Sequence, residues 1–297
     1  MTALDVLCIG HASYDITMRV PHHPGANEKM HAEALRYDGG GPAANAAVAV
    51  RRLGGTSAYC GYLGWDVYGD ANAKAFVHEG VDLRWTVRGE QPTPLSTILA
   101  KPDGTRCVIN YKRETPWLQP EELASMPEMA AGVLLFDGHE PLISVDIARA
   151  ARRRGIPTVI DAGSVHRGTR ELVPMIDYLV SSERFALDWA QTADAHVALA
   201  RLAEIAPNVV VTRGGGDLLW ARNGERGQMA AFQVDVVDST GAGDAFHGAF
   251  AFGLARGMGW AELLRYASAV GALTCTKLGA RAGIPDADAV RSFLDTH

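Results

Sequence analysis

The chain has 297 residues, which is enough for one large domain or for a domain with an appendage. Hydrophobic residues make up 47% of it and its net charge is −6, as in an ordinary water-soluble globular protein. Nucleic acids and anionic membranes attract basic surfaces, so this acidic balance argues against nonspecific binding to either. We therefore expect neither a nucleic-acid partner nor a membrane partner.

The cysteines are scattered along the chain and include no Cys-x-x-Cys pair: Cys8, Cys60, Cys107 and Cys275. Isolated thiols of this kind are typical of a reducing compartment rather than of a disulfide framework. The first residues lack a basic stretch followed by an apolar one, so we expect no secretory signal. These observations predict a cytoplasmic protein.

Short apolar runs alternate with helical patterns through most of the chain. The predicted strands cover 4–9, 57–63, 132–136, 157–161, 178–181 and 209–212. The predicted helices cover 42–53, 70–79, 143–154 and 194–205, and the chain is mostly helical from 245 to 294. Repeated alternation of strand and helix implies a mainly parallel sheet with helices on both faces, a three-layer α/β/α core.

Two segments, 16–36 and 88–111, carry β-like patterns with no helix between them. Within the second, residues 97–100 and 106–111 flank Pro102-Asp103-Gly104, which is a strong hairpin turn. A hairpin is rare in the middle of a parallel α/β core. We therefore predict a small antiparallel sheet outside the core.

The stretch from Asp238 to Asp244 reads Asp-Ser-Thr-Gly-Ala-Gly-Asp and opens a helical pattern. Small residues at a helix start leave backbone N–H groups open to an anion, and the helix dipole favours negative charge there. A carboxylate beside such a site is unfavourable unless it has a role, such as taking a proton from an attacking hydroxyl. A simple helix cap would also explain Asp244.

A second glycine-rich stretch, Gly39-Gly40-Gly41-Pro42-Ala43-Ala44-Asn45, runs directly into a predicted helix. Glycines let the backbone approach a ligand closely, and the Asn45 amide can both donate to and accept from sugar hydroxyls. Asp15 lies just past the first predicted strand, where open α/β sheets bind ligands. A flexible loop and a turn-forming Asp are the alternatives for these residues.

Together the two stretches resemble the signatures of the PfkB (ribokinase-like) carbohydrate kinases, and the resemblance spans roughly residues 4–285. The C-terminal signature usually reads Asp-Thr-x-Gly-Ala-Gly-Asp, so Ser239 is a departure that keeps the hydroxyl. The N-terminal signature is Gly-Gly-x-x-x-Asn. The resemblance implies a ribokinase-like core, 1–10, 39–87 and 112–297, and a β-sheet lid over the sugar, 11–38 and 88–111.

The resemblance also implies roles for individual residues in an ATP-dependent sugar kinase. Asp244 is the expected general base, and Gly241, Ala242 and Gly243 form the expected anion hole. The expected substrate-binding residues are Asp15, Gly40, Gly41, Asn45 and Asn110, with Lys29 as a lid cation. The expected nucleotide-binding residues are Thr212 and Gly214, in a stretch similar to the family's Val-Thr-x-Gly, with Ser182, Ala272 and Cys275.

The expected cofactors are ATP, Mg²⁺ and a monovalent cation such as K⁺. Asp161, which ends a predicted strand, is the candidate for reaching Mg²⁺ through water. Ser182 and Phe185 stand where many relatives carry the Asn and Glu that organise the metal, which weakens that part of the resemblance. Asp238 and Thr240 are the candidates for the monovalent cation, and the lid is the expected surface of a homodimer.

The substrate prediction depends on three short matches to the ketohexokinase and sulfofructose kinase branch: Gly39–Ala44, Ile109–Tyr111 and Gly279–Pro285. A neutral ketose or polyol needs only hydroxyl partners, whereas sulfofructose also needs cations. Lys29, Lys112 and Arg113 could supply one, but no Arg follows the 133–136 strand. We therefore place a neutral sugar ahead of sulfofructose, and a nucleoside kinase or a non-catalytic sensor stay open.

Overall fold

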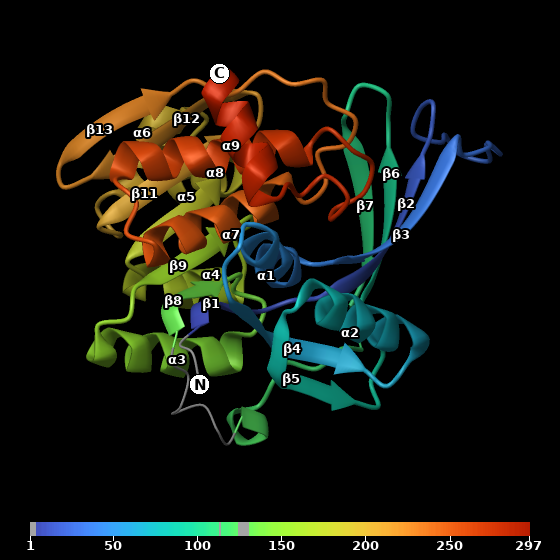
Figure 1. The fold of residues 1–297 in the computed structure, drawn as a ribbon, viewed down its shortest axis with the longest axis horizontal. Coiled ribbons are helices and arrows are strands. Elements are labelled where there is room, and N and C mark those ends of the chain that lie inside the picture. Colours follow the sequence, from blue (N-terminus) through green and yellow to red (C-terminus); the bar gives the residue numbers. More distant parts are fainter. Residues whose placement is uncertain (1–3, 113, 124–130) are drawn as a thin grey trace.

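A computed structural model of the chain describes residues 4–112, 114–123 and 131–297, and its centre is a large mainly parallel sheet (Figure 1). The strands run in the order β13-β12-β11-β10-β9-β8-β1-β4-β5. Only β11–β12 and β12–β13 pair antiparallel within it. Their bounds are β1 Leu4–Ile9, β4 Ser57–Gly64, β5 Asp82–Gly89, β8 Ala131–Phe136, β9 Thr158–Ala162, β10 Tyr178–Ser182, β11 Asn208–Arg213, β12 Gly216–Arg222 and β13 Glu225–Met229.

Helices cover both faces of this sheet, which confirms the predicted three layers. Successive residues of a strand point to opposite faces, so Val6 and Cys8 lie in one apolar core and Leu7 and Ile9 in the other. The first core lies under α1 Pro42–Arg52, α2 Val67–Glu79, α7 Ala242–Ala255, α8 Trp260–Thr274 and α9 Ala287–Thr296. The second lies under α3 Pro141–Arg154, α4 Arg167–Leu172, α5 Glu183–Ala190 and α6 Ala195–Leu202.

The close crossing of α1 and α7 brings the two glycine-rich stretches together. A side chain at Gly248 of α7 would place its Cβ only 2.6 Å from the Ala46 carbonyl oxygen of α1, so a glycine is required there. Pro42 occupies the first turn of α1, where its missing N–H has no intrahelical acceptor to lose. The crossing brings the first turns of both helices, with Asn45 and Asp244, to the same end of the sheet.

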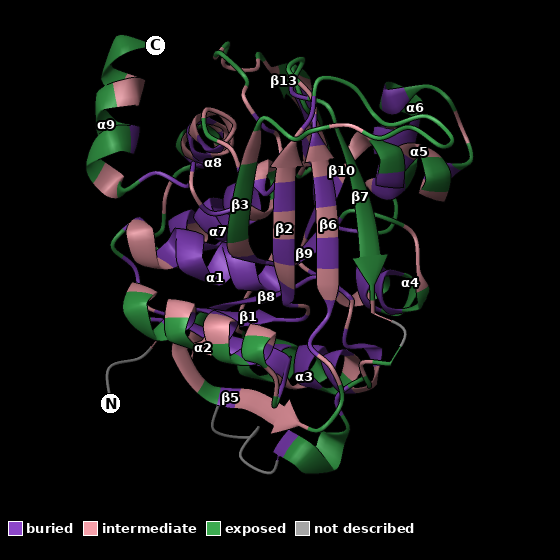
Figure 2. Cartoon of the chain, turned by 90° about the vertical axis from the view of Figure 1, so that its right-hand side faces the viewer, coloured by how far each residue is buried: buried purple, intermediate pink, exposed green. Residues whose placement is uncertain are grey.

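The second sheet stands to one side of the three layers (Figure 1) and is seen face-on in Figure 2. Its order is β3-β2-β6-β7, with bounds β2 Ser13–Arg19, β3 Ala34–Gly40, β6 Leu95–Ala100 and β7 Arg106–Tyr111. The predicted hairpin is confirmed, because β6 and β7 pair antiparallel on either side of the Pro102 turn. The central pair, β2 and β6, is parallel, which the sequence pattern did not predict.

Several elements were absent from the prediction. β5 and the β12–β13 hairpin lie at opposite edges of the large sheet, where polar side chains hide the strand pattern. The short helices α4 and α5 and the 3₁₀ turns η1 Pro120–Leu123 and η3 Val173–Met175 were missed as well. Among the helices of the described residues, none has the length and apolar character that crossing a membrane requires.

The aromatic cluster beneath α7 gives a stability prediction. Phe250 is fully buried and its ring contacts the rings of Tyr178, Phe246 and Trp260. Phe250→Ala is expected to lower the free energy of unfolding by about 3–5 kcal/mol, because it removes buried surface and leaves a cavity. Urea denaturation measures this change. Val77→Ala, on an exposed face of α2, is the control and should cost under about 0.5 kcal/mol.

Candidate active site

The N-terminus of α7 carries the glycine-rich stretch. Gly241 is its N-cap and has φ 77°, in the left-handed region that favours glycine. A Cβ at Gly241 would lie 2.5 Å from the Ala280 carbonyl oxygen, so a larger residue would collide with backbone. The first N–H groups of a helix have no acceptor within the helix and carry the positive end of its dipole. This end of α7 is therefore built to receive an anion.

The Asp244 carboxylate lies in this first turn and is held by Asn45. Asn45 Nδ2 donates to Asp244 Oδ2 at 2.7 Å, across the crossing of α1 and α7. Burial raises the pKa of Asp244, whereas the Asn45 hydrogen bond and the nearby charges of His247 and Arg106 lower it. A carboxylate with a raised pKa accepts a proton more readily, as a general base must. The contact also accounts for Asp244 beyond a simple helix cap.

Asp15, which follows the first predicted strand, lies inside β2 of the small sheet, within the predicted lid segment 11–38. It is buried and accepts a hydrogen bond from Ser13 Oγ at 2.7 Å. The strand register places it in one row with Ser96, which is also buried, and with Asn110, which is exposed on β7. Asp15 and Asn110, which are 95 residues apart in the chain numbering, thus share a face because β6 lies between their strands.

The glycines next to Asp15 leave the room that it occupies. A Cβ at Gly40 would lie 2.1 Å from Asp15 Oδ2, and one at Gly41 would lie 2.5 Å from the His11 carbonyl oxygen. Gly41 also has φ 95°. Close packing therefore favours glycine at both of these predicted positions, which lie just before Asn45 in the chain.

The charge of Asp15 gives a pH-dependent prediction. Burial raises the pKa of Asp15 from 3.8 to about 6, so the folded state binds this proton more tightly than the unfolded chain. The resulting stabilisation is present below about pH 4 and is lost as the pH rises through 6. Asp15→Asn should therefore be more stable than the wild type at pH 8, with the difference disappearing near pH 4. Melting temperatures at both values test this, and an equal difference at both would contradict it.

A cavity of about 460 Å³ begins beside the anion site of α7 and contains most of the predicted nucleotide residues. Thr212, Gly214, Ala242, Gly243, Ala272 and Cys275 all line it. Arg106, from the first position of β7, lines it too and donates from Nη1 to Ser239 Oγ at 2.6 Å. Arg106 was not among the predicted site residues, although a basic residue just after the hairpin turn was the available signal.

Two other predicted binding residues lie elsewhere. Ser182 is the N-cap of α5: its Oγ accepts from the Phe185 N–H at 3.1 Å and donates to the Gly163 carbonyl at 3.0 Å. It is absent from the lining of the large cavity. Lys29 is exposed in the loop between β2 and β3. Arg113 lies outside the described residues.

The residues predicted to contact cations already have protein partners. Asp161 Oδ2 lies 3.3 Å from His247 Nδ1, and burial raises the pKa of this carboxyl. Asp238 Oδ1 accepts from the N–H and the hydroxyl of Thr240, and its Oδ2 accepts from the Gly279 N–H. Within the described ranges no three His, Cys, Asp or Glu side chains form a metal-binding group. The contact of Asp161 with Mg²⁺ through water, and that of Asp238 and Thr240 with a monovalent cation, thus stay predictions.

Asp137 is a site residue that the sequence analysis did not identify. Its Oδ2 accepts from the N–H groups of His11 and Ala43 at 2.7 and 3.3 Å, and its Oδ1 accepts from that of His139 at 2.8 Å. This carboxylate joins the ends of β1 and β8 to the start of α1. The signal was present, because Asp137 directly follows a buried strand.

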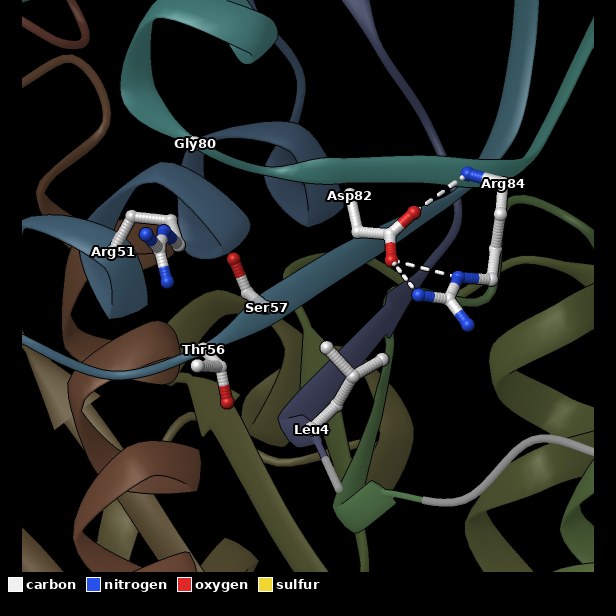
Figure 3. A pocket seen from close by; sticks show the side chains of 7 residues that line it. All are labelled: Leu4, Arg51, Thr56, Ser57, Gly80, Asp82 and Arg84. Carbon is white, nitrogen blue, oxygen red and sulfur yellow. Dashed lines mark hydrogen bonds and ion pairs between the residues drawn. The ribbon is translucent and has the colours of Figure 1, made fainter. Parts of the chain in front are cut away.

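A smaller hollow of about 230 Å³ lies at the amino ends of the parallel strands, away from the site described above. Figure 3 shows its lining at the amino ends of β1, β4 and β5, where Asp82 is already paired with Arg84. None of the predicted site residues contributes to it. Ligands of open α/β sheets bind at the carboxyl ends of the strands. We therefore place the candidate active site at that end and not at this hollow.

Comparison with known proteins agrees with this geometry. The model of the pfkB family carbohydrate kinases matches residues 3–287. A ribokinase of Haemophilus influenzae is 27% identical and an ATP-dependent ribose-1-phosphate kinase of Halopiger xanaduensis 29%, each alignment covering 97% of both chains. The structure of Arabidopsis thaliana ribokinase complexed with ribose and ATP superposes with a TM-score of 0.84, at 26% identity over 99% of both chains. The chain therefore belongs to the pfkB family of carbohydrate kinases and is an ATP-dependent sugar kinase.

Proposed function

We propose that this kinase transfers the γ-phosphoryl group of ATP to a primary hydroxyl of a small neutral sugar, a ketose or a related polyol. The observation that supports it most is the position of Asp244. Its half-buried carboxylate, held by Asn45, directly follows Ala242 and Gly243 of the cavity wall and interacts electrostatically with Asp15 of the small sheet. A base at that position can reach a hydroxyl on one side and a phosphoryl group on the other.

In the proposed reaction, Asp15, Asn45 and Asn110 orient the sugar. Asp244 takes the proton of the hydroxyl as its oxygen bonds to the γ-phosphorus, and the bond from that phosphorus to the β-γ bridging oxygen of ATP breaks. The N–H groups at the start of α7 stabilise the negative charge on the transferred group. Arg106, at the cavity wall beside Ser239, adds a positive charge on the same side.

Mg²⁺ and K⁺ belong to this proposal as well. Mg²⁺ is held in many kinases largely by phosphate oxygens and water, with one or two carboxylates, and it neutralises phosphate charge. Asp161 is the carboxylate at a strand end that could serve it. For K⁺, Asp238 and Thr240 remain the candidates, although their contacts in this structure are explained by the turn that they form.

A preference for a neutral substrate is supported by a cluster of titratable groups between the sheets: His11, Lys112, Asp137, His139, Glu140 and His166. The ring of His139 stacks on that of His166 and contacts that of His11. Burial lowers the pKa of His139 to about 4, which leaves its imidazole neutral at pH 7. The charges of Asp137 and Glu140 favour the protonated form of Lys112, while burial lowers its pKa. The cluster thus offers donors and acceptors for hydroxyls, with its positive charge already balanced.

We also propose that the small sheet, β2, β3, β6 and β7, closes over the sugar as a lid. Its predicted segments, 11–38 and 88–111, shift slightly, because β3 runs to Gly40 and β5, which ends at Gly89, belongs to the large sheet. Lids exclude water and so suppress hydrolysis of ATP.

The outer face of the small sheet carries Leu35, Tyr37 and Ile109, which are 52%, 58% and 60% exposed. Apolar exposure on a sheet with free edges favours a homodimer through the lid. Light scattering of the wild type and of Ile109→Lys tests this, and a monomeric wild type would contradict it.

The function is tested by ADP release with Mg-ATP and K⁺ against a panel of acceptors: fructose, ribose, 2-keto-3-deoxygluconate, adenosine, fructose 1-phosphate and sulfofructose. Turnover of fructose or another neutral sugar, well above that of the other compounds, is the expected result. Selective turnover of sulfofructose or fructose 1-phosphate would overturn the neutral substrate. Selective turnover of adenosine would identify a nucleoside kinase instead.

A further inference from the structure

Arg281 is a buried cation that neither the sequence analysis nor the proposed reaction uses. It is 2% exposed, in the segment between α8 and α9, and its guanidinium lies 4.9 Å from the centre of the Phe76 ring. Its Nε donates to Asn45 Oδ1 at 2.9 Å. Within the described part of the chain, Nη1 and Nη2 have no hydrogen-bond partner. Burying an incompletely paired guanidinium costs free energy, so its retention at this position calls for a role.

The contact with Arg281 determines which way the Asn45 amide faces. A guanidinium has only donors, so the amide must turn its oxygen toward Arg281. Its Nδ2 then faces Asp244 and donates to the carboxylate at 2.7 Å. The reversed amide would set donor against donor at Arg281 and acceptor against acceptor at Asp244. One hydrogen bond of Arg281 therefore fixes a second one, at the carboxylate.

We infer that Arg281 is a positioning residue for phosphoryl transfer: acting through Asn45, it holds the Asp244 carboxylate in the orientation that accepts the sugar proton. This inference rests on the proposed function of Asp244. The surrounding packing is consistent with it, because a Cβ at Gly39 would lie 2.0 Å from Nη1, so the first glycine of the Gly39–Gly41 stretch leaves the space that the guanidinium fills.

Arg52 supplies a matched control in the same place. Its Nη1 donates to the carbonyl oxygens of Arg281 and Ile284 at 2.5 and 3.1 Å, and its Nη2 pairs with Glu79 at 2.6 Å. Arg52 thus supports the backbone of the Arg281 segment without an identified contact to Asn45. A purely structural role of Arg281 would make the two arginines equivalent, whereas a positioning role would separate them.

The experiment measures kcat and KM of Arg281→Met, Arg281→Lys, Arg52→Met and Asn45→Ala, and of the double variant of Arg281→Met with Asn45→Ala. The acceptor is the sugar that the wild type turns over fastest. Asp244→Asn is the blank, so that the role of Asp244 in phosphorylation is tested separately from the role of Arg281. Arg281→Met should lower kcat by about 10–100-fold, the loss expected for a hydrogen-bond network ending on a charged group. In the Asn45→Ala background the same change should lower kcat less than about 3-fold.

Further outcomes separate positioning from folding. Arg281→Lys keeps a donor and a charge and should restore part of kcat, while Arg52→Met should lower the melting temperature and leave kcat near that of the wild type. The inference is overturned if Arg281→Met lowers kcat equally with and without the Asn45 amide. It is also overturned if Arg281→Met retains wild-type kcat, or if Arg52→Met loses kcat to the same extent. Should Arg281→Met not fold, Arg281→Lys in both backgrounds gives the same comparison.

Discussion

Asp244→Asn is expected to reduce kcat by about 10²–10⁴-fold, the range for removal of a general base. The amide has the size and shape of the carboxylate, so the fold should persist, but it cannot accept a proton at neutral pH. The Asn45 Nδ2 that now donates to Asp244 Oδ2 at 2.7 Å can still donate to an amide oxygen. KM for ATP should change little. Steady-state assays at saturating sugar and ATP measure the effect.

The matched control removes another carboxylate that lies at the start of a helix but outside the candidate site. Asp194 caps α6 and accepts from the N–H groups of His196 and Val197, and Asn caps helices as well as Asp does. Asp194→Asn should therefore keep both kcat and the melting temperature. An Asp244→Asn variant that retained more than about a tenth of wild-type kcat would show that another group takes the proton.

Gly241→Ala is the second substitution with a large expected effect. Gly241 has φ 77°, where an alanine costs about 1–2 kcal/mol, and its new Cβ would lie 2.5 Å from the Ala280 carbonyl oxygen. Either the start of α7 or the Ala280 backbone must move. Both movements displace the N–H groups at the anion site, and losing one such donor typically costs about 10²–10³ in rate. We therefore expect kcat to fall by that factor and stability to fall as well.

The conformational and steric parts of this effect can be separated. Gly257, after the other end of α7, has φ 72° but no heavy atom within 4 Å of its Cβ position. Gly257→Ala should therefore show the backbone cost alone, about 1–2 kcal/mol in urea denaturation, with unchanged kcat. If Gly241→Ala behaved in the same way, the start of α7 would have no part in catalysis.

The sequence patterns predicted the local features well because they depend on neighbouring residues. Alternating apolar runs predicted the parallel sheet, and Pro102-Asp103-Gly104 predicted the β6–β7 hairpin. Prediction failed where the pattern was weak or ambiguous. The edge strands β5, β12 and β13 were not predicted, nor was the parallel pairing of β2 with β6. Ser182, predicted to bind nucleotide, caps α5, and its role toward the nucleotide stays a prediction.

By itself, the sequence determined the chemistry of the two glycine-rich stretches, since backbone freedom at glycine and capping at a helix start are local properties. Only the tertiary structure decided which distant groups meet. Asn45 and Asp244 are 199 positions apart, and Asn45 and Arg281 are 236 apart. They meet because α1 and α7 cross closely at Gly248 and the segment after α8 returns beneath α1. A contact of that kind is set by the packing of whole helices, and no short stretch of sequence contains it.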